Sequence, residues 1–215
     1  MIKKLFLLGA ISISLISFAQ QQKISIVPSV GYAWRIAETA SGLSKAEKDY
    51  VKGLKNGLHF DISAYYNLRN IGLGVKFSHF NASSNGFLFG YNNNGMPVSI
   101  PVTTKDNITF VGPSLMYSNY NEPTKHKLFF DVAIGIISYT TKTADIKGTG
   151  SNLGLDAGVG YQYEVSKNFL IGPKLGVTAG TLNKMTFNGR TVDFGNDQKE
   201  GLTRVSLSAA ATFRF

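Results

Sequence analysis

Eight charged residues fall on the polar face of alternating segments and are the first candidates for chemistry in this chain. They are Asp61, Lys76, Asp131, Asp156, Glu164, Lys174, Arg204 and Arg214. Carboxylates and amines along one face could pass protons or ions, and a pair of carboxylates could work as general acid and base. They could equally form ion pairs that fill a narrow interior, because charges removed from water need partners. The mixture of signs favours the ionic network, since a conducting pore would carry lumen charge of one sign.

Residue types that hold metals are scarce in the sequence. The 215 residues include no cysteine, which excludes disulfides and thiolate metal sites. The three histidines, His59, His79 and His126, are scattered, and no metal-ligand spacing joins them. We therefore predict neither a metal nor a cofactor. The net charge of +9 includes no basic cluster with interleaved aromatics, so no nucleic-acid partner is predicted.

The first 19 residues have the pattern of an export signal. Lys3 and Lys4 precede an apolar run over residues 5–18, and Ser17-Phe18-Ala19 is a small-x-small cleavage site. The apolar run is short for a helix that spans a membrane. The pattern predicts a signal peptide over residues 1–19 and a single domain over residues 20–215.

The elements that must position the charged residues are strands, because apolar and polar residues alternate almost throughout the domain. The alternating segments span about 24–35, 57–67, 71–78, 108–118, 127–140, 152–164, 169–180 and 202–215. The links after the first, third and seventh segments are long, and those after the second, fourth and sixth are short. This predicts an all-β fold, an eight-stranded antiparallel up-and-down transmembrane β-barrel with long extracellular loops and short periplasmic turns.

Alternation alone does not say which face points outward. A soluble lipocalin-like barrel would turn its apolar face inward around a ligand. The apolar face here carries aromatics near segment ends, including Trp34, Tyr66 and Phe213, as the interfacial girdles of membrane barrels do. The polar face is rich in glycine and serine, which suits a narrow interior crowded by ionic side chains. Both features predict that the apolar face contacts lipid.

Two local expectations follow from the segments. If Leu68 and Arg69 are the central residues of the turn after the second segment, Asp61 lies directly opposite Lys76 as an interior ion pair. Three similar stretches, VPSVGY, GPSLMY and GPKLGV, at 27–32, 112–117 and 172–177, each put a proline on the apolar face. Because proline removes a ladder hydrogen bond, we expect these prolines near strand ends or bulges.

The signal peptide, the eight alternating segments and the terminal TFRF together resemble the small OmpA/OmpX-type outer-membrane β-barrel family. The resemblance covers about residues 20–215. It implies a location in the outer membrane, contact with outer-membrane lipid and lipopolysaccharide, and a monomer. In that family the barrel-assembly machinery reads a C-terminal aromatic, which implies this role for Phe215, with Phe213 on the same face.

The long links carry the candidate binding residues. Residues 86–102 have apolar-rich arms around Asn94-Gly95, and residues 184–194 have them around Asn188-Gly189, a strong hairpin signal. Exposed apolar surface and free strand edges invite partners, so we expect an extracellular protein ligand to bind there. The residues assigned to this binding are Phe87, Phe89, Tyr91, Phe187, Val192 and Phe194. The alternative is that the arms pack on each other above the barrel.

A short helix is predicted within residues 44–56, because Ser44 and Glu47 fit a capping box. The helix carries four lysines, and its alternatives are a plain loop helix and a lipopolysaccharide-binding helix.

The function favoured by the sequence is non-enzymatic, a structural or surface-interaction role through the extracellular hairpins. Three alternatives stay open: a lipid A-modifying enzyme, a narrow channel and an accessory barrel of a secretion system. For the enzyme, residues 78–85, SHFNASSN, resemble the His-x-Ser-Asn-Ala stretch of lipid A deacylases. However, Asn81 stands where the nucleophilic serine should be, and no acidic residue is identified to orient His79.

Overall fold

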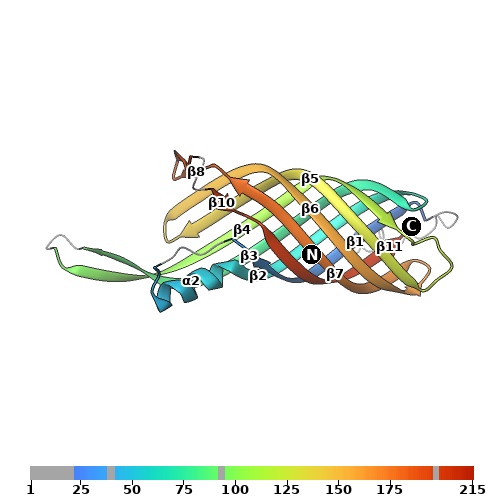
Figure 1. The fold of residues 1–215 in the computed structure, drawn as a ribbon, viewed down its shortest axis with the longest axis horizontal. Coiled ribbons are helices and arrows are strands. Elements are labelled where there is room, and N and C mark those ends of the chain that lie inside the picture. Colours follow the sequence, from blue (N-terminus) through green and yellow to red (C-terminus); the bar gives the residue numbers. More distant parts are fainter. Residues whose placement is uncertain (1–21, 38–41, 92–94, 196–198) are drawn as a thin grey trace, which may run out of the picture.

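The structure is a computed structural model that describes residues 22–37, 42–91, 95–195 and 199–215. Eight long antiparallel strands form a closed ring in which each strand pairs with two neighbours. They are β1 (Ile24–Arg35), β2 (Asn56–Leu68), β3 (Ile71–Tyr91), β4 (Pro97–Ser118), β5 (His126–Thr143), β6 (Ile146–Ser166), β7 (Phe169–Leu182) and β11 (Arg204–Arg214). The ring closes because β6 pairs with β7, and β11 lies between β7 and β1. Figure 1 shows the strands wrapping the cylinder at a tilt, and the predicted eight-stranded barrel is confirmed.

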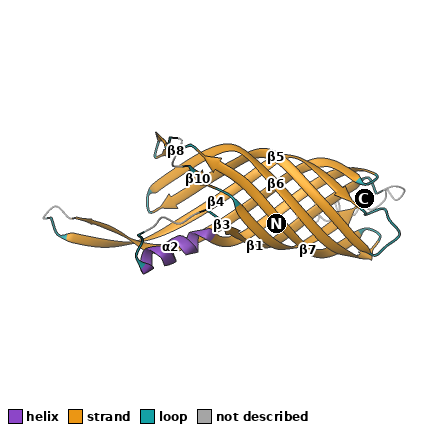
Figure 2. Ribbon diagram, viewed as in Figure 1, coloured by secondary structure: helices purple, strands orange, loops and turns teal. Residues whose placement is uncertain are grey.

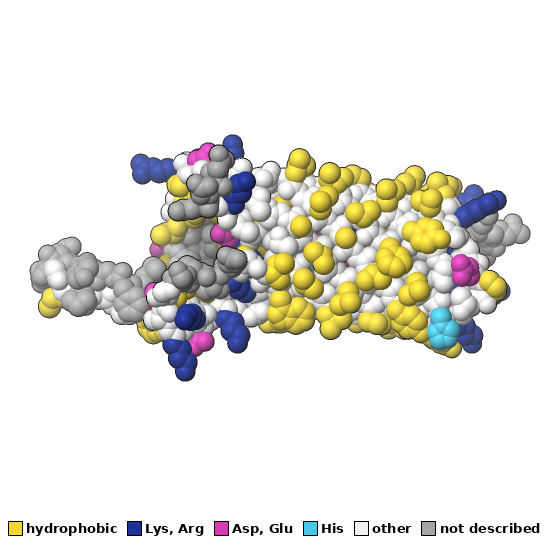
Figure 3. Space-filling model, in the orientation of Figure 1, with side chains coloured by type: hydrophobic (Ala, Val, Ile, Leu, Met, Phe, Trp, Pro, Cys, Tyr) yellow, Lys and Arg dark blue, Asp and Glu magenta, His cyan; other side chains and the backbone are white. Residues whose placement is uncertain are grey.

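The outward face of the barrel is an apolar belt. The apolar belt comprises outward-facing side chains of the eight strands, among them Val30, Ile62, Val75, Val111, Ile136, Leu153, Leu175 and Leu207. Figure 3 shows these side chains spread along the cylinder, with charged side chains gathered at its two ends. On the alternate face Asp61 and Lys76 are each only 2% exposed. This inversion of the usual inside and outside is what lipid requires, so the predicted orientation of the faces is confirmed.

Three prolines, Pro28, Pro113 and Pro173, lie where a ring strand has a neighbour on both sides, and each interrupts the ladder on one side. Pro28, Pro113 and Pro173 are in register with β2, β3 and β11 respectively. On the other side, the pairs that they would form with β11, β5 and β6 are missing from the ladders. Proline has no N–H to donate, so each ladder is interrupted where the proline ring faces it. The expectation of a strand end or a bulge is wrong, because each proline lies inside a strand and the register is the same on both sides of the interruption.

The extracellular end of the barrel carries the additional elements (Figure 2). Helix α2 (Lys45–Lys55) follows β1, and the last long link contains β8 (Lys184–Phe187), β9 (Arg190–Asp193) and β10 (Glu200–Gly201). Asn188 and Gly189 join β8 to β9 with positive φ angles of 45° and 86°, which confirms the predicted hairpin. Among the described residues, no helix is long and apolar enough to cross a membrane.

Strands β3 and β4 continue far beyond the rest of the barrel. The last pairing of β3 with β2 is at Asn81, and the last pairing of β4 with β5 is at Thr104. Beyond these points the two strands pair only with each other, up to Tyr91 and Pro97. We call residues 85–91 and 97–103 the β3–β4 ribbon, which projects from the extracellular end in Figure 1. Asn94, one of the two expected turn residues, lies outside the described residues.

The periplasmic turn between β2 and β3 differs from the expectation. Leu68 pairs with Ile71, so the two turn residues are Arg69 and Asn70, and Arg69 has a φ of 56°. The register therefore shifts by two residues relative to a turn at Leu68 and Arg69. A shift of two keeps every side chain on its face but changes its partner across the ladder.

Candidate functional site

The centre of the barrel holds an ionic layer. Lys76 Nζ lies 2.5 Å from Asp131 Oδ2 and also contacts Asp156. Lys174 Nζ lies 2.8 Å from Asp61 Oδ1 and 3.7 Å from Asp131 Oδ2. All five side chains are at most 5% exposed, and they come from β2, β3, β5, β6 and β7. Side chains alternate between the two faces of each strand, so these five point into the lumen. Because the ring is closed, side chains from strands that are not neighbours meet there.

The expected Asp61–Lys76 ion pair is wrong. In the observed register Asp61 lies opposite Ser78, and Lys76 lies opposite Ser63. Asp61 instead accepts hydrogen bonds from Lys174 and from the Ser29 hydroxyl, at 2.8 and 2.6 Å. The charged partner, Lys174, is on β7 across the lumen, whereas Ser29 lies directly opposite Asp61 on the neighbouring strand β1.

Arg204 is also buried at this level but is held differently. Its Nη2 donates to Ser78 Oγ at 2.9 Å, and its guanidinium lies 5.9 Å from the centre of the Phe80 ring. Within the described part of the chain, no carboxylate lies within ion-pair distance of Arg204. His59 has its Nε2 3.3 Å from Asp61 Oδ2, so it extends the ionic layer toward the extracellular side.

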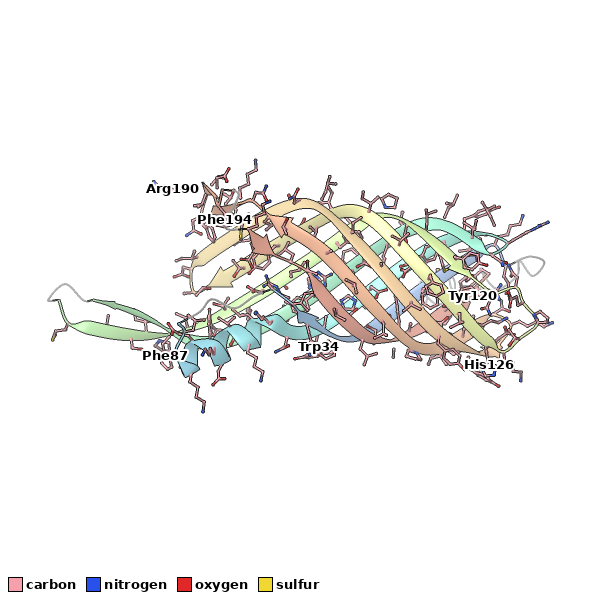
Figure 4. The ribbon with its side chains drawn as sticks, viewed as in Figure 1. Trp34, Phe87, Tyr120, His126, Arg190 and Phe194 are labelled. Carbon is pink, nitrogen blue, oxygen red and sulfur yellow. The ribbon has the colours of Figure 1, made fainter. Side chains whose placement is uncertain are left out.

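Glu164 and Arg214 lie at the periplasmic end, apart from the ionic layer. Glu164 pairs with Lys127 at 3.0 Å and is partly exposed. Arg214 donates to the Tyr120 carbonyl at 2.9 Å and to Asn121 Oδ1 at 2.7 Å, and its guanidinium stacks over the Tyr120 ring at 5.4 Å. Figure 4 shows Tyr120 at this end of the barrel.

Apolar clusters fill the lumen on both sides of the ionic layer. The extracellular cluster comprises Ala33, Phe80, Ala82, Ile108, Phe110, Ala133, Ile137, Tyr139, Leu182, Met185 and Leu202. The periplasmic cluster comprises Val27, Tyr65, Met116, Tyr120, Phe129 and Leu170. Following β5 from Phe129 through Asp131 to Ile137 passes from one cluster through the ionic layer to the other. The interior is therefore a layered core.

The last long link folds back over the extracellular mouth. Arg35 Nη2 donates to Glu200 Oε1 and to the Gly201 carbonyl, both at 2.6 Å, and Nη1 lies 3.4 Å from Asp106 Oδ2. The guanidinium also lies 5.3 Å from the centre of the Tyr139 ring. Strand β10 pairs with β7, and Leu202 just after it is fully buried. Arg35 thus joins this link to the barrel wall.

The six predicted binding residues fall into different surroundings. Phe87 is 58% exposed on the β3–β4 ribbon, and Val192 is 41% exposed on β9. Phe89 and Tyr91 lie in β3, but their side chains are outside the described ones. Phe187 and Phe194 are partly buried against the extracellular cluster. In the last link Phe187 and Phe194 therefore pack onto the barrel, which differs from the alternative in which the arms pack on each other.

Helix α2 begins at the predicted capping box. The Glu47 backbone N–H donates to Ser44 Oγ at 3.3 Å, and the Ser44 N–H donates to Glu47 Oε2 at 2.8 Å. Hydrogen bonding by the Ser44 side chain and backbone lowers the pKa of Glu47. The Tyr50 hydroxyl is 2.5 Å from Thr104 Oγ1, and a Cβ added at Gly86 would lie 2.5 Å from the Tyr50 ring. Gly86 therefore lets the helix dock closely on β3.

The surroundings of His79 are not those of a catalytic base. Its Nδ1 lies 3.0 Å from Thr109 Oγ1, and the Asn81 amide donates to Asn107 Oδ1 at 2.8 Å. In the described residues no carboxylate contacts the His79 ring. Those residues also hold no group of three histidines or acidic side chains placed to bind a metal.

Four residues that shape the interior were not singled out from the sequence. Tyr120 and Lys127 close the periplasmic end, and Arg35 and Asp106 join the last link to the wall. Tyr120 offered one signal, an aromatic inside a short polar turn. Arg35 carried no signal of its role, because its partners Asp106 and Glu200 are far away in the sequence.

The two assembly-signal candidates lie where β11 ends. Phe213 is 41% exposed on the outer face, and its ring lies 5.2 Å from the Phe169 ring. Phe215 exchanges backbone hydrogen bonds with Ile24, with N···O distances of 2.9 and 3.1 Å. The backbone of Phe215 therefore continues the ladder between β11 and β1.

Solved structures with this fold come from outer membranes. Neisserial surface protein A (NspA) superposes with a TM-score of 0.56 at 13% identity, over 90% of this chain and 97% of that chain. A major outer membrane protein from Thermus thermophilus gives a TM-score of 0.52 at 15% identity, over 90% and 98%. With the apolar belt, this fold is that of an integral outer-membrane β-barrel.

No curated protein matches the chain. A family model described as "Domain of unknown function (DUF2715)" matches residues 18–215, which includes all eight ring strands. On that match, this barrel belongs to the DUF2715 family.

Proposed function

We propose that this barrel is a non-enzymatic surface protein that binds an extracellular protein through the β3–β4 ribbon. The observation that carries the proposal is the ribbon itself, which leaves the barrel beyond Asn81 and Thr104 and has no other strand beside it. A two-stranded ribbon is only marginally stable by itself, so a ribbon that projects from the barrel would be stabilised by a further contact. A bound partner protein would supply that contact.

The side chains of the ribbon support a binding role. Phe87 is 58% exposed and Ile100 is 56% exposed, and Met96 beside the turn is 55% exposed. Phe87 and Ile100 lie well beyond Val111, the last exposed apolar residue of β4 in the belt, so lipid does not cover them. The register puts Phe87 on one face of the ribbon and Ile100 on the other, so each face carries an exposed apolar side chain outside the membrane. Exposed apolar surface of this kind is typical of protein-binding sites.

A partner is expected to bind the side chains of the ribbon and not to add a strand to the edge of β4. The interrupted ladder at Pro113 shows that its nitrogen faces β5. Because backbone N–H direction alternates along a strand, Pro97 and Pro101 face the same side, which is the free edge of β4. These prolines remove two donors that an added strand would need. The free edge of β4 is therefore protected, and on that side the apolar side chains are the groups available to a partner.

Two other functions receive less support from the geometry. The layered core fills the lumen with mixed charges and apolar clusters, which disfavours a channel. The absence of a carboxylate at His79 among the described residues disfavours a lipid-modifying esterase.

The experiment compares three forms of the mature barrel on a panel of immobilised serum and extracellular-matrix proteins. The first is intact, the second has residues 88–100 replaced by a short Gly/Ser link, and the third is Phe87→Ser/Ile100→Ser. We expect the altered forms to lose at least tenfold in affinity for whichever panel protein binds the intact barrel. Ile146→Ser, at a comparably exposed apolar residue at the start of β6, is the matched control and should bind normally. Equal binding by all forms, with the barrel folded by heat-dependent gel mobility, contradicts the proposal.

A further inference from the structure

A polar groove lies on the outer wall just above the apolar belt, between β5–β6 and the β8–β9 hairpin. Its volume is about 460 Å³. Its hydroxyl side chains are Ser138, Thr140, Thr149, Ser151, Thr186 and Thr191, and Lys184 also lines it. We call this the hydroxyl groove. In Figure 1 the strands that line it meet in the upper part of the extracellular end, where β8 lies beside β6.

The register of β5 and β6 arranges the outer wall in ordered rungs. Ile136 pairs with Leu153 at the edge of the belt, and Ser138 pairs with Ser151 immediately beyond it. The next outward rungs are Thr140 with Thr149 and then Lys142 with Lys147. From the membrane outward, the wall therefore changes from apolar to hydroxyl to cationic.

The outermost rung places three lysines, Lys105, Lys142 and Lys147, side by side on adjacent strands. Lys142 lies directly opposite Lys147 on one side and directly opposite Lys105 on the other. All three lysines are exposed, and no carboxylate of the described residues pairs with them. Like charges directly opposite each other in a sheet are destabilising. Three adjacent strands keep this arrangement, which an anion above the groove would stabilise.

The hydroxyls of the wall are free for a ligand as well. Thr186 and Thr191 bond to each other at 2.9 Å, so their rung is closed on itself. Among the described residues, Ser138, Thr140, Thr149 and Ser151 have no side-chain hydrogen bond. Free hydroxyls on a partly exposed wall can donate to and accept from the hydroxyls of a sugar.

We propose that the hydroxyl groove binds the phosphorylated sugar headgroup of a glycolipid in the outer leaflet. The acyl chains would lie on Ile136 and Leu153, the sugar on the serine and threonine rungs, and a phosphate beside Lys142 and Lys147. Lys142 is six positions beyond Ile136, roughly 20 Å along the tilted strand, which suits a short phosphorylated saccharide. From the membrane outward, the apolar, hydroxyl and cationic rungs of the wall match the acyl chains, sugar and phosphate of such a lipid.

The membrane lipid is favoured over a soluble anionic glycan because the groove is continuous with the belt. Ser138 and Ser151 are each two residues from belt positions, with no charged rung between them. A soluble glycan would gain nothing from this continuity, whereas a lipid contacts belt and groove together. The proposal does not depend on the β3–β4 ribbon, which lies on other strands.

The experiment uses the mature barrel in phosphatidylcholine nanodiscs that contain a small fraction of bisphosphorylated lipid A. Native mass spectrometry counts the lipid A molecules retained on the protein, and titration gives an apparent Kd. We expect Lys142→Gln/Lys147→Gln to weaken retention by roughly 10- to 30-fold, since each lysine contributes near an anionic surface. Thr140→Val/Thr149→Val, which keeps strand propensity and shape, should weaken it by roughly threefold to tenfold.

Control variants and control ligands distinguish the groove from helix α2 and a membrane lipid from a soluble glycan. Lys45→Gln/Lys48→Gln on α2 removes the same charge elsewhere and should retain lipid A normally, as should the barrel trimmed of residues 88–100. Dephosphorylated lipid A should bind no better to the intact barrel than to the double lysine variant. Loss of retention only in the α2 variant would assign binding to the helix and overturn the proposal. Binding of soluble heparin with the same dependence on Lys142 and Lys147, and no retention of lipid A, would overturn it too.

Discussion

At the scale of single residues, Lys76 is a buried cation that depends on two buried carboxylates. Its amine is 2% exposed and lies between the carboxylates of Asp131 and Asp156. Burying charges costs free energy that only good partners offset, and losing one partner strands the others. The stability of the barrel therefore depends on the set of charges rather than on one pair.

We predict that Lys76→Met destabilises the barrel by about 3–5 kcal/mol, because two buried carboxylates lose their cation. Lys76→Met/Asp131→Leu should cost less than the sum of its two single substitutions. Denaturant unfolding in detergent, followed by gel mobility, measures these values. Lys167→Met, an exposed lysine of a periplasmic turn, is the control and should change stability by less than about 0.5 kcal/mol. Additive losses at Lys76 and Asp131 would contradict the network.

Phe215 gives a second prediction at this scale. Its backbone is bonded to Ile24 whatever its side chain, so Phe215→Ser should leave the stability of a refolded barrel nearly unchanged. If the barrel-assembly machinery reads the aromatic ring, the same substitution should lower the folded fraction in the outer membrane. Comparing in vitro refolding with cell fractionation separates the two effects. A normal folded fraction in cells would show that the ring is not needed.

At the scale of elements, the strands were predictable and their partners were not. The belt pattern placed β1 at its observed bounds, but it gave no signal for β3 over residues 79–85, because the outward residues there are polar. Residues 86–91 were expected as one arm of a hairpin, and they continue β3. The turn at Arg69-Asn70 was missed because a shift of two residues preserves both faces. The contacts of Lys76 with Asp131 and Asp156 cross the lumen between strands that are not neighbours. Strand patterns contain no information on such contacts.

The wall near Pro113 supports a prediction about glycine. A Cβ added at Gly112 would lie 2.2 Å from the Ile134 carbonyl oxygen, a backbone atom that cannot move aside alone. Gly112→Ala should therefore destabilise the barrel by about 1–3 kcal/mol through strain between β4 and β5. Gly176→Ala is the control, since its nearest neighbour is the Ser206 hydroxyl, a side chain that can rotate. Equal unfolding midpoints for the two variants would show that the wall adapts.

Helix α2 supports a prediction about pH. Ser44 lowers the folded-state pKa of Glu47, so the capping bond stabilises the helix at neutral pH and is lost as pH falls through that lowered pKa. Amide exchange of residues 45–48, corrected for the intrinsic pH dependence, should accelerate in acid. In Ser44→Ala the exchange should already be about fivefold faster at neutral pH and should lose this pH dependence. A pH response unchanged by Ser44→Ala would assign it to another group.

At the scale of the whole molecule, the layered core predicts an electrically silent barrel. Two apolar clusters and an ionic layer of mixed charge lie in series along the lumen. An ion would have to displace packed side chains at each level. The intact barrel in planar bilayers should therefore show no resolved conductance steps in molar potassium chloride. Steps that persist in the purified, fully folded protein would contradict the packing described.

The pairing of β1 with β11 has a consequence for the order in which the barrel can form. These strands are neighbours in space yet lie at opposite ends of the run of ring strands, with Ile24 bonded to Phe215. Contacts so distant along a chain form slowly, because loop closure must precede them. Until β11 is delivered, β1 presents an open edge to any other chain in the periplasm. We therefore expect closure of the β1–β11 seam to be the slowest step of barrel formation, and the step at which pairing with another chain competes.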